Sequence, residues 1–190
     1  MTAFEHGFFR ARGLDSRRSL PLLGGAAIAA CLAISAASAA PGDQASAAMV
    51  NAEGEPVGNV ELMETPQGTL ISAKFSNLPE GPHAFHVHET GSCEPPFTSA
   101  GGHYNPTSAK HGILSPEGMH AGDMPNIYVP ASGELTIEIL NANLAVDESL
   151  LDDDGAAIVV HAGPDDYQSD PAGDAGDRIA CGVIKGGTGG

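Results

Sequence analysis

Short stretches of alternating apolar and polar residues, separated by turns rich in glycine and proline, constrain the fold of this chain most strongly. The stretches 57–63 and 69–75 alternate with a period of two, as strands with one buried face do, and Pro66-Gln67-Gly68 predicts a turn between them. Further strands are expected at 83–88, 127–129, 133–140, 156–161 and 179–184. Several short strands joined by turns indicate a β-sandwich or a β-barrel.

Two long segments, 90–125 and 162–177, separate predicted strands and show no periodicity. The first is rich in Gly, Pro, Ser and His, and the second contains five Asp residues. A loop as long as the first is uncommon inside a compact domain unless it is functional or cross-linked. We therefore expect these loops to carry the function.

The first 39 residues differ from the rest of the chain and predict a signal peptide. Four arginines precede an uncharged apolar stretch, 20–39, and Ala37-Ser38-Ala39 offers a cleavage site between small residues. Arg17-Arg18 is similar to the core of a twin-arginine export signal. Residues 40–46 are expected to form a flexible leader, and 47–190 the folded domain. The mature protein is then exported, periplasmic or extracellular.

Two alternatives to a cleaved signal peptide remain open. An uncleaved membrane anchor is disfavoured because the Ala- and Gly-rich stretch is weakly hydrophobic and Pro21 interrupts its start. A lipid anchor on Cys31 is disfavoured because apolar residues continue beyond that cysteine. We expect no stable membrane insertion of the mature domain.

The charge of the mature chain excludes one class of partner. From residue 40 onward there are four basic and 22 acidic residues, a formal net charge of −18. Nucleic acid is not expected as a partner, because no basic patch is present to replace phosphate counterions. High negative charge also keeps an exported protein soluble, so it does not by itself indicate a function.

Two cysteines, Cys93 and Cys181, remain in the mature chain. An even number of cysteines in an oxidising compartment indicates a disulfide, and the alternative of two unpaired thiols is the weaker one outside the cytosol.

Histidines are concentrated in one part of the sequence. Seven of the eight lie between residues 83 and 161. His86 and His88 are two apart on a predicted strand, so their side chains share a face. The first long loop and the end of a later strand add further donors: His103, His111, His120, Asp123 and His161. Imidazole suits copper and zinc, and three His with one carboxylate suit tetrahedral zinc. A pH-responsive surface would not require this spacing, so the pattern predicts a metal centre.

Five motifs, in order, resemble the copper–zinc superoxide dismutase family from about residue 47 to 185. They are Phe85-His86-Val87-His88-Glu89, Ser99-Ala100-Gly101-Gly102-His103-Tyr104-Asn105-Pro106, His120-Ala121-Gly122-Asp123, Val159-Val160-His161-Ala162-Gly163-Pro164-Asp165-Asp166 and Ala175-Gly176-Asp177-Arg178-Ile179-Ala180-Cys181-Gly182-Val183-Ile184. The resemblance implies an all-β fold, an eight-stranded Greek-key β-sandwich or flattened barrel with two long functional loops.

The resemblance also implies the roles of individual residues. Copper would be bound by His86, His88, His103 and His161, and zinc by His103, His111, His120 and Asp123. His103 would bridge the two ions and carry a proton in catalysis. Asp165 would link His88 to His111 from outside the ligand sphere, and His83 would be a hydrogen-bonding residue that binds no metal. Cys93 and Cys181 would form the family disulfide.

The implied function is dismutation of superoxide to dioxygen and hydrogen peroxide, with a redox-active copper and a structural zinc. Arg178 would hold the anionic substrate beside copper; the alternative is a surface salt bridge with Asp174 or Asp177. The loop 162–177 has no Lys, unlike that of many relatives, which puts the rate in question. A non-enzymatic metal-binding module is the rival function, and monomer and homodimer are both compatible with the sequence.

Overall fold

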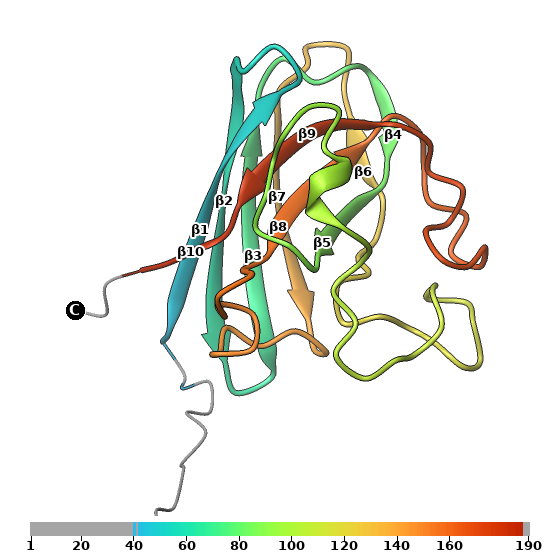
Figure 1. Ribbon diagram of the computed structural model, residues 1–190. Coiled ribbons are helices and arrows are strands. Elements are labelled where there is room, and N and C mark those ends of the chain that lie inside the picture. Colours follow the sequence, from blue (N-terminus) through green and yellow to red (C-terminus); the bar gives the residue numbers. More distant parts are fainter. Residues whose placement is uncertain (1–39, 41, 188–190) are drawn as a thin grey trace, which may run out of the picture. The chain divides into compact units, whose positions relative to one another are not determined.

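The computed structural model describes Ala40 and residues 42–187, and within them the chain is built from short strands joined by turns and two long loops (Figure 1). The elements are β1 (Gln44–Asn51), β2 (Pro56–Thr65), β3 (Gly68–Phe75), β4 (Gly81–His83), β5 (Phe85–His88), the 3-10 turn η1 (Thr98–Ala100), β6 (Ile127–Val129), β7 (Leu135–Asn141), β8 (Ala157–His161), β9 (Arg178–Val183) and β10 (Lys185–Gly186). No helix in this part of the chain has the length and apolarity needed to cross a membrane.

Eight strands form one antiparallel sheet in the order β5-β8-β9-β1-β2-β3-β7, with β10 paired to β1. The short strands β4 and β6 pair separately with each other. The chain runs from β3 through β4, β5 and β6 to β7 beside β3, and then crosses to β8 beside β5. These crossings are the ones a Greek-key arrangement needs, and the all-β, eight-stranded prediction is confirmed.

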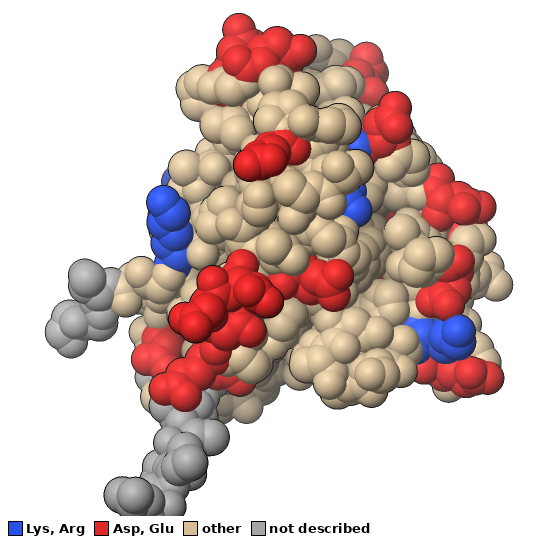
Figure 2. Space-filling model, viewed as in Figure 1, with Lys and Arg blue, Asp and Glu red and all other residues tan. Residues whose placement is uncertain are grey.

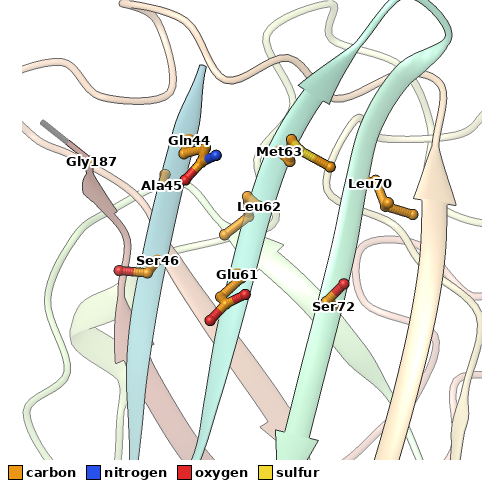
Figure 3. A pocket seen from close by; sticks show the side chains of 9 residues that line it. All are labelled: Gln44, Ala45, Ser46, Glu61, Leu62, Met63, Leu70, Ser72 and Gly187. Carbon is orange, nitrogen blue, oxygen red and sulfur yellow. The ribbon is translucent and has the colours of Figure 1, made fainter. Parts of the chain in front are cut away.

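The alternation read from the sequence becomes the two faces of this sheet. Along β2 and β3, Val60, Leu62 and Ile71 are fully or almost fully buried, while Glu61 and Ser72 pair across the two strands on the outer face (Figure 3). The outer face in Figure 3 is lined by small and polar side chains and by Met63 and Leu70. It lies on strands that carry none of the predicted ligands.

Most predicted strand ends lie within two residues of the observed ones, but two predictions differ further from the structure. β1 begins at Gln44, which pairs with Met63, so the last three residues of the predicted leader 40–46 belong to the sheet. The predicted strand 83–88 is divided at Ala84, whose N–H donates to Gly163 and whose carbonyl accepts from His161 N–H. Those bonds direct one half toward β6 and the other toward β8. The predicted signal segment 1–39 lies outside the described residues.

The loop between β7 and β8 is fixed to one end of the sheet by a buried carboxylate. Glu64, the second-last residue of β2, accepts the N–H of Val146 at 2.9 Å through Oε2, which also lies 3.1 Å from Thr69 Oγ1. The Thr69 hydroxyl lies 2.8 Å from the carbonyl of Leu144. Leu144 and Val146 are thereby held in the hydrophobic core.

We expect Glu64→Ala to destabilise the protein, because it leaves the buried N–H of Val146 without its acceptor. The loss should be about 2 kcal/mol in the free energy of unfolding, measured by urea denaturation of the metal-free protein. Glu61→Ala is the matched control, since Glu61 is exposed on the same strand, and should change the value by less than about 0.5 kcal/mol. Equal losses in the two variants would contradict this role for Glu64.

Candidate metal centre

The predicted ligands come from two strands and one loop. His86 and His88 lie on β5, which pairs with β8, and His161 is the last residue of β8. The loop between β5 and β6 supplies the others: His103, His111, His120 and Asp123. Every one of these side chains is buried.

Backbone hydrogen bonds fix this loop against β5. Val87, between the two strand histidines, donates to Gly122 and accepts from Tyr104, at 2.9 Å each, and Gly122 donates to Tyr104 at 2.8 Å. A Cβ atom on Gly122 would overlap the carbonyl oxygen of Val87, so only glycine permits this approach. The segments around 103 and 120–123 are thus carried to the strand that holds His86 and His88.

Four imidazoles form the first ligand group: His86, His88, His103 and His161, whose ligand atoms all lie within 4.8 Å of one another. Three of these rings have one nitrogen held from outside the group. His86 Nε2 lies 2.9 Å from Asp165, His88 Nδ1 lies 3.0 Å from the carbonyl of Gly101, and His161 Nδ1 lies 3.2 Å from that of Gly176.

The other nitrogens of this group face one another. His88 Nε2 and His161 Nε2 are 3.3 Å apart, and the buried atoms His86 Nδ1 and His103 Nε2 have no hydrogen-bond partner. Buried nitrogen atoms without partners are costly. Four converging imidazole nitrogens, three of them oriented from behind, fit a copper ion.

The second group converges on one carboxylate oxygen. Asp123 Oδ1 lies 2.7, 3.1 and 3.3 Å from the Nδ1 atoms of His103, His111 and His120. Tetrahedral zinc with bonds near 2.0–2.1 Å places neighbouring ligand atoms roughly 3.3 Å apart. Asp123 Oδ2 accepts the N–H groups of Gly112 and His120, at 2.9 and 3.0 Å. Three imidazoles and an oriented carboxylate at this spacing fit zinc.

His103 belongs to both groups. Its Nδ1 faces Asp123, and its Nε2 is the atom that lacks a hydrogen-bond partner on the copper side. Its ring centroid lies 4.1 Å from that of His86 and 5.5 Å from that of His120. The geometry therefore places one imidazole between two metal positions, as the resemblance implied.

The carboxylate of Asp165 connects the two groups, but through a different histidine from the one expected. Its Oδ2 lies 2.9 Å from His86 Nε2 and its Oδ1 lies 3.0 Å from His111 Nε2. The expected contact with His88 is wrong, because the Nδ1 of that ring is hydrogen-bonded to Gly101. His86 presents Nδ1 to the copper group, which leaves Nε2 for Asp165.

Burial and hydrogen bonding give the two groups opposite electrostatic characters before metal binds. Burial lowers the pKa of His86 to about 4 and that of His161 to about 3, so these rings are neutral and have free lone pairs. Burial also lowers the pKa of His111, but hydrogen bonds with Asp123 and Asp165 outweigh it and raise the value to about 9. Zinc must therefore displace a proton from His111 near neutral pH.

Hydrogen bonds also keep the two carboxylates ionised. Burial alone would raise the pKa of Asp123 and of Asp165, but hydrogen bonds with the neighbouring histidines hold both values well below their usual range. Two buried negative charges beside the second ligand group favour a divalent cation there.

Arg178 lies at the edge of the copper group and is held by backbone carbonyls. Its Nη1 donates to Phe97 at 2.6 Å and its Nη2 to Gly101 at 2.7 Å. The guanidinium contributes, after burial, to the lowered pKa of His88 and of His161, which places its charge near both rings. Within residues 42–187 the salt bridge with Asp174 or Asp177 that the sequence left open does not form.

The segment that holds Arg178 is fixed in turn by the disulfide. Cys93 and Cys181 are bonded, with their Cα atoms 5.6 Å apart, so this part of the prediction is confirmed. Cys181 lies on β9, three residues after Arg178, and both cysteines pack in a second small core that includes Phe97 and Ala100. The covalent bond ties the 93–101 segment to the strand that bears the guanidinium.

Comparison with known proteins agrees with this geometry. The family model described as copper/zinc superoxide dismutase (SODC) matches residues 57–184. This chain belongs to that family. A Cu-Zn superoxide dismutase 2 of Aquifex aeolicus (strain VF5) is 51% identical over 148 residues, which cover 75% of this chain and 86% of the relative.

Solved structures of the superoxide dismutase fold are similar as well. A SOD-like protein from Bacillus subtilis matches with a TM-score of 0.70 and 38% identity, covering 73% of this chain and 96% of that structure. The Cu/Zn superoxide dismutase from Brucella abortus matches with a TM-score of 0.64 and 33% identity, covering 75% and 99%. The chain is thus a copper/zinc superoxide dismutase, an oxidoreductase with a copper site and a zinc site.

Sequence reasoning missed several residues that support the site of this superoxide dismutase. The carbonyl of Gly101 accepts from both His88 and Arg178. Gly173, with φ +65°, lies where any Cβ atom would overlap the carboxylate of Asp165. Asn126 forms two side-chain hydrogen bonds with the backbone of Asp165. Gly101 lies inside one of the five family motifs. For Asn126 and Gly173 the sequence offers only their nearness along the chain to Asp123 and Asp165, respectively.

Three single substitutions should separate the two ligand groups. His88→Ala should lower copper content alone, His120→Ala should lower zinc content alone, and His103→Ala should lower both, because only His103 belongs to both groups. Metal content is measured by atomic emission on folded, purified protein. Full zinc occupancy in His103→Ala would contradict the shared position of this ring.

Proposed function

We propose that this enzyme removes superoxide outside the cytoplasm, with Arg178 binding the anion and His103 carrying a proton. The observation that supports these roles is the adjacency of three features. A shared imidazole, an inward-facing copper ligand group and a fixed guanidinium lie together at one edge of β5, β8 and β9.

Bound copper supplies one-electron oxidation and reduction, and bound zinc supplies structural support and a fixed positive charge. The chain itself supplies the position of the substrate. Superoxide is a small anion, and Arg178 offers a planar set of donors that stays charged at any relevant pH. The two carbonyls that accept from Nη1 and Nη2 fix the guanidinium, so its remaining N–H groups are available for the anion.

Proton delivery is the proposed role of His103. Its Nε2 has no protein hydrogen-bond partner, while its Nδ1 is fixed by Asp123 at 2.7 Å. A proton held on Nε2 therefore faces the copper group and can be given to the peroxide that forms when superoxide gains an electron. Two superoxide ions and two protons then give one dioxygen and one hydrogen peroxide, which balances charge and atoms.

The rival function, a non-enzymatic metal-binding module, requires only the ligand groups. Such a module does not need a guanidinium held beside the copper group by a disulfide-anchored segment. Arg178 and all four copper ligands are present and brought together in this chain. We therefore favour catalysis over storage.

Long-range attraction of superoxide is expected to be weak. Acidic side chains are spread over the face shown in Figure 2, with few basic ones between them. Lys110, a candidate for attracting the anion, is paired with Asp170 at 2.9 Å, which neutralises its charge locally. In the loop 162–177, Asp166, Asp174 and Asp177 are exposed and unfavourable to an anion. Arg178 and the bound metals then act over about one Debye length, ~8 Å at physiological salt.

We expect the second-order rate with superoxide to change little, or to rise, as ionic strength increases from low to physiological values, because salt screens the surrounding negative charge. Arg178→Glu should lower the rate at least about 10-fold, a loss of about 1.4 kcal/mol in transition-state stabilisation. Lys74→Glu is the control, since it makes the same change of charge on the exposed face of β3. Pulse radiolysis gives all three rates, and a steep fall with salt in the unmodified enzyme would contradict this proposal.

The proposed location rests on the arginine-flanked apolar segment before Ala40 and on the disulfide of the mature domain. In the native host, the enzyme should be recovered from the exported fraction with an N-terminus just after Ala39. The double substitution Arg17→Lys and Arg18→Lys should retain it in the cytoplasm. Recovery from membranes with an acyl group on Cys31 would instead establish a lipid anchor.

A further inference from the structure

Tyr167 is a residue of the loop 162–177 that the proposed mechanism does not use. It lies two positions after Asp165 and is half-buried, with φ +66°, a backbone conformation that is uncommon for a side chain other than glycine. A residue stays in such a conformation only where its surroundings hold it, and such positions concentrate at functional sites.

All three polar groups of Tyr167 form hydrogen bonds, and each bond joins this residue to Asp165 or to the loop between β5 and β6. Its N–H donates to Asp165 Oδ1 at 2.6 Å, and its carbonyl accepts the N–H of Leu114 at 3.1 Å. Its hydroxyl accepts the N–H of Asn126 at 2.8 Å. Leu114 and Asn126 flank the segment that carries His120 and Asp123, so one residue fixes both ends of that segment.

The partner of the hydroxyl, Asn126, itself holds Asp165. Its Oδ1 accepts the N–H of Asp165 at 2.8 Å, and its Nδ2 donates to the carbonyl of Asp165 at 2.9 Å. Tyr167 and Asn126 therefore close a ring of hydrogen bonds around the backbone and carboxylate of Asp165. The two oxygens of that carboxylate reach His86 on the copper side and His111 on the zinc side.

The approach of the two loops at this point is close. A Cβ atom on Gly112, φ +105°, would overlap the carbonyl oxygen of Tyr167. Gly112 also donates its N–H to Asp123 Oδ2 at 2.9 Å. The backbone of Tyr167 thus contacts the residue that orients the zinc carboxylate.

We propose that Tyr167 is a positioning residue whose hydroxyl, acting through Asn126, pre-orients the Asp165 bridge between the two metal sites. The proposal rests on the copper and zinc assignment above. Removing the hydroxyl leaves Asp165 less fixed, so zinc binding must order the bridge and zinc affinity falls. Tyr167 itself touches neither a metal position nor the substrate.

The test compares Tyr167→Phe with Tyr128→Phe in the purified mature enzyme. Each change removes one phenolic hydroxyl, and Tyr128 on β6 is 70% exposed. Zinc affinity is measured by chelator competition, and the zinc site is also examined by the visible absorption of cobalt(II) placed there. Tyr167→Phe should weaken zinc binding about 3- to 10-fold, the equivalent of one hydrogen bond, and shift the cobalt absorption. Tyr128→Phe should change affinity less than about 2-fold.

A double-mutant cycle with Asp165→Asn tests whether the effect passes through the bridge. In the Asp165→Asn background, Tyr167→Phe should have little further effect on zinc affinity. An undiminished effect there would overturn the proposal. So would a lower melting temperature of metal-free Tyr167→Phe with unchanged zinc affinity, the result of loop packing alone. Failure of the unmodified enzyme to bind zinc would instead refute the metal assignment.

Discussion

Seven metal-ligating side chains lie inside a protein interior in which buried polar atoms must be satisfied. The protein meets this constraint in two ways. In the copper group, the nitrogens of His86, His88 and His161 that point away from the centre are bonded to Asp165 or to a carbonyl, while two that point inward, His86 Nδ1 and His103 Nε2, have no hydrogen-bond partner. Metal ions complete the second set, so the same feature that would be a defect in an ordinary core defines the two sites.

The two long loops hold the metal ligands in place, and hydrogen bonds to β5 and between the loops hold the loops themselves. The 90–125 loop is attached to β5 by backbone hydrogen bonds at Val87. The 162–177 loop is attached to the 90–125 loop through Tyr167 and through Asp170, which accepts hydrogen bonds from Lys110 and from the N–H of His111. The sheet provides the rigid base, since β5, β8 and β9 are adjacent (Figure 1). Two long segments that contain no strand, and only the short 3-10 turn η1, thereby become precise supports for the metal ligands.

Much of the fold and the ligand set could be predicted because both leave local patterns. Period-two alternation marked β2 and β3, and the His-Val-His spacing marked a strand face. The break at Ala84 and the pairing of Gln44 could not be predicted, because each depends on a partner distant in sequence. The partner of Asp165 was assigned to His88 wrongly, since which ring nitrogen faces the metal is decided in three dimensions. The carbonyl ligands of Arg178 were missed because backbone groups have no sequence signature.

The carbonyl oxygen of Gly101 accepts hydrogen bonds from a copper ligand, His88, and from Arg178, the residue that we propose binds the substrate. One oxygen atom therefore restrains both the imidazole ring and the guanidinium. The disulfide-anchored segment that carries this oxygen thus links β5, which bears His88, to β9, which bears Arg178.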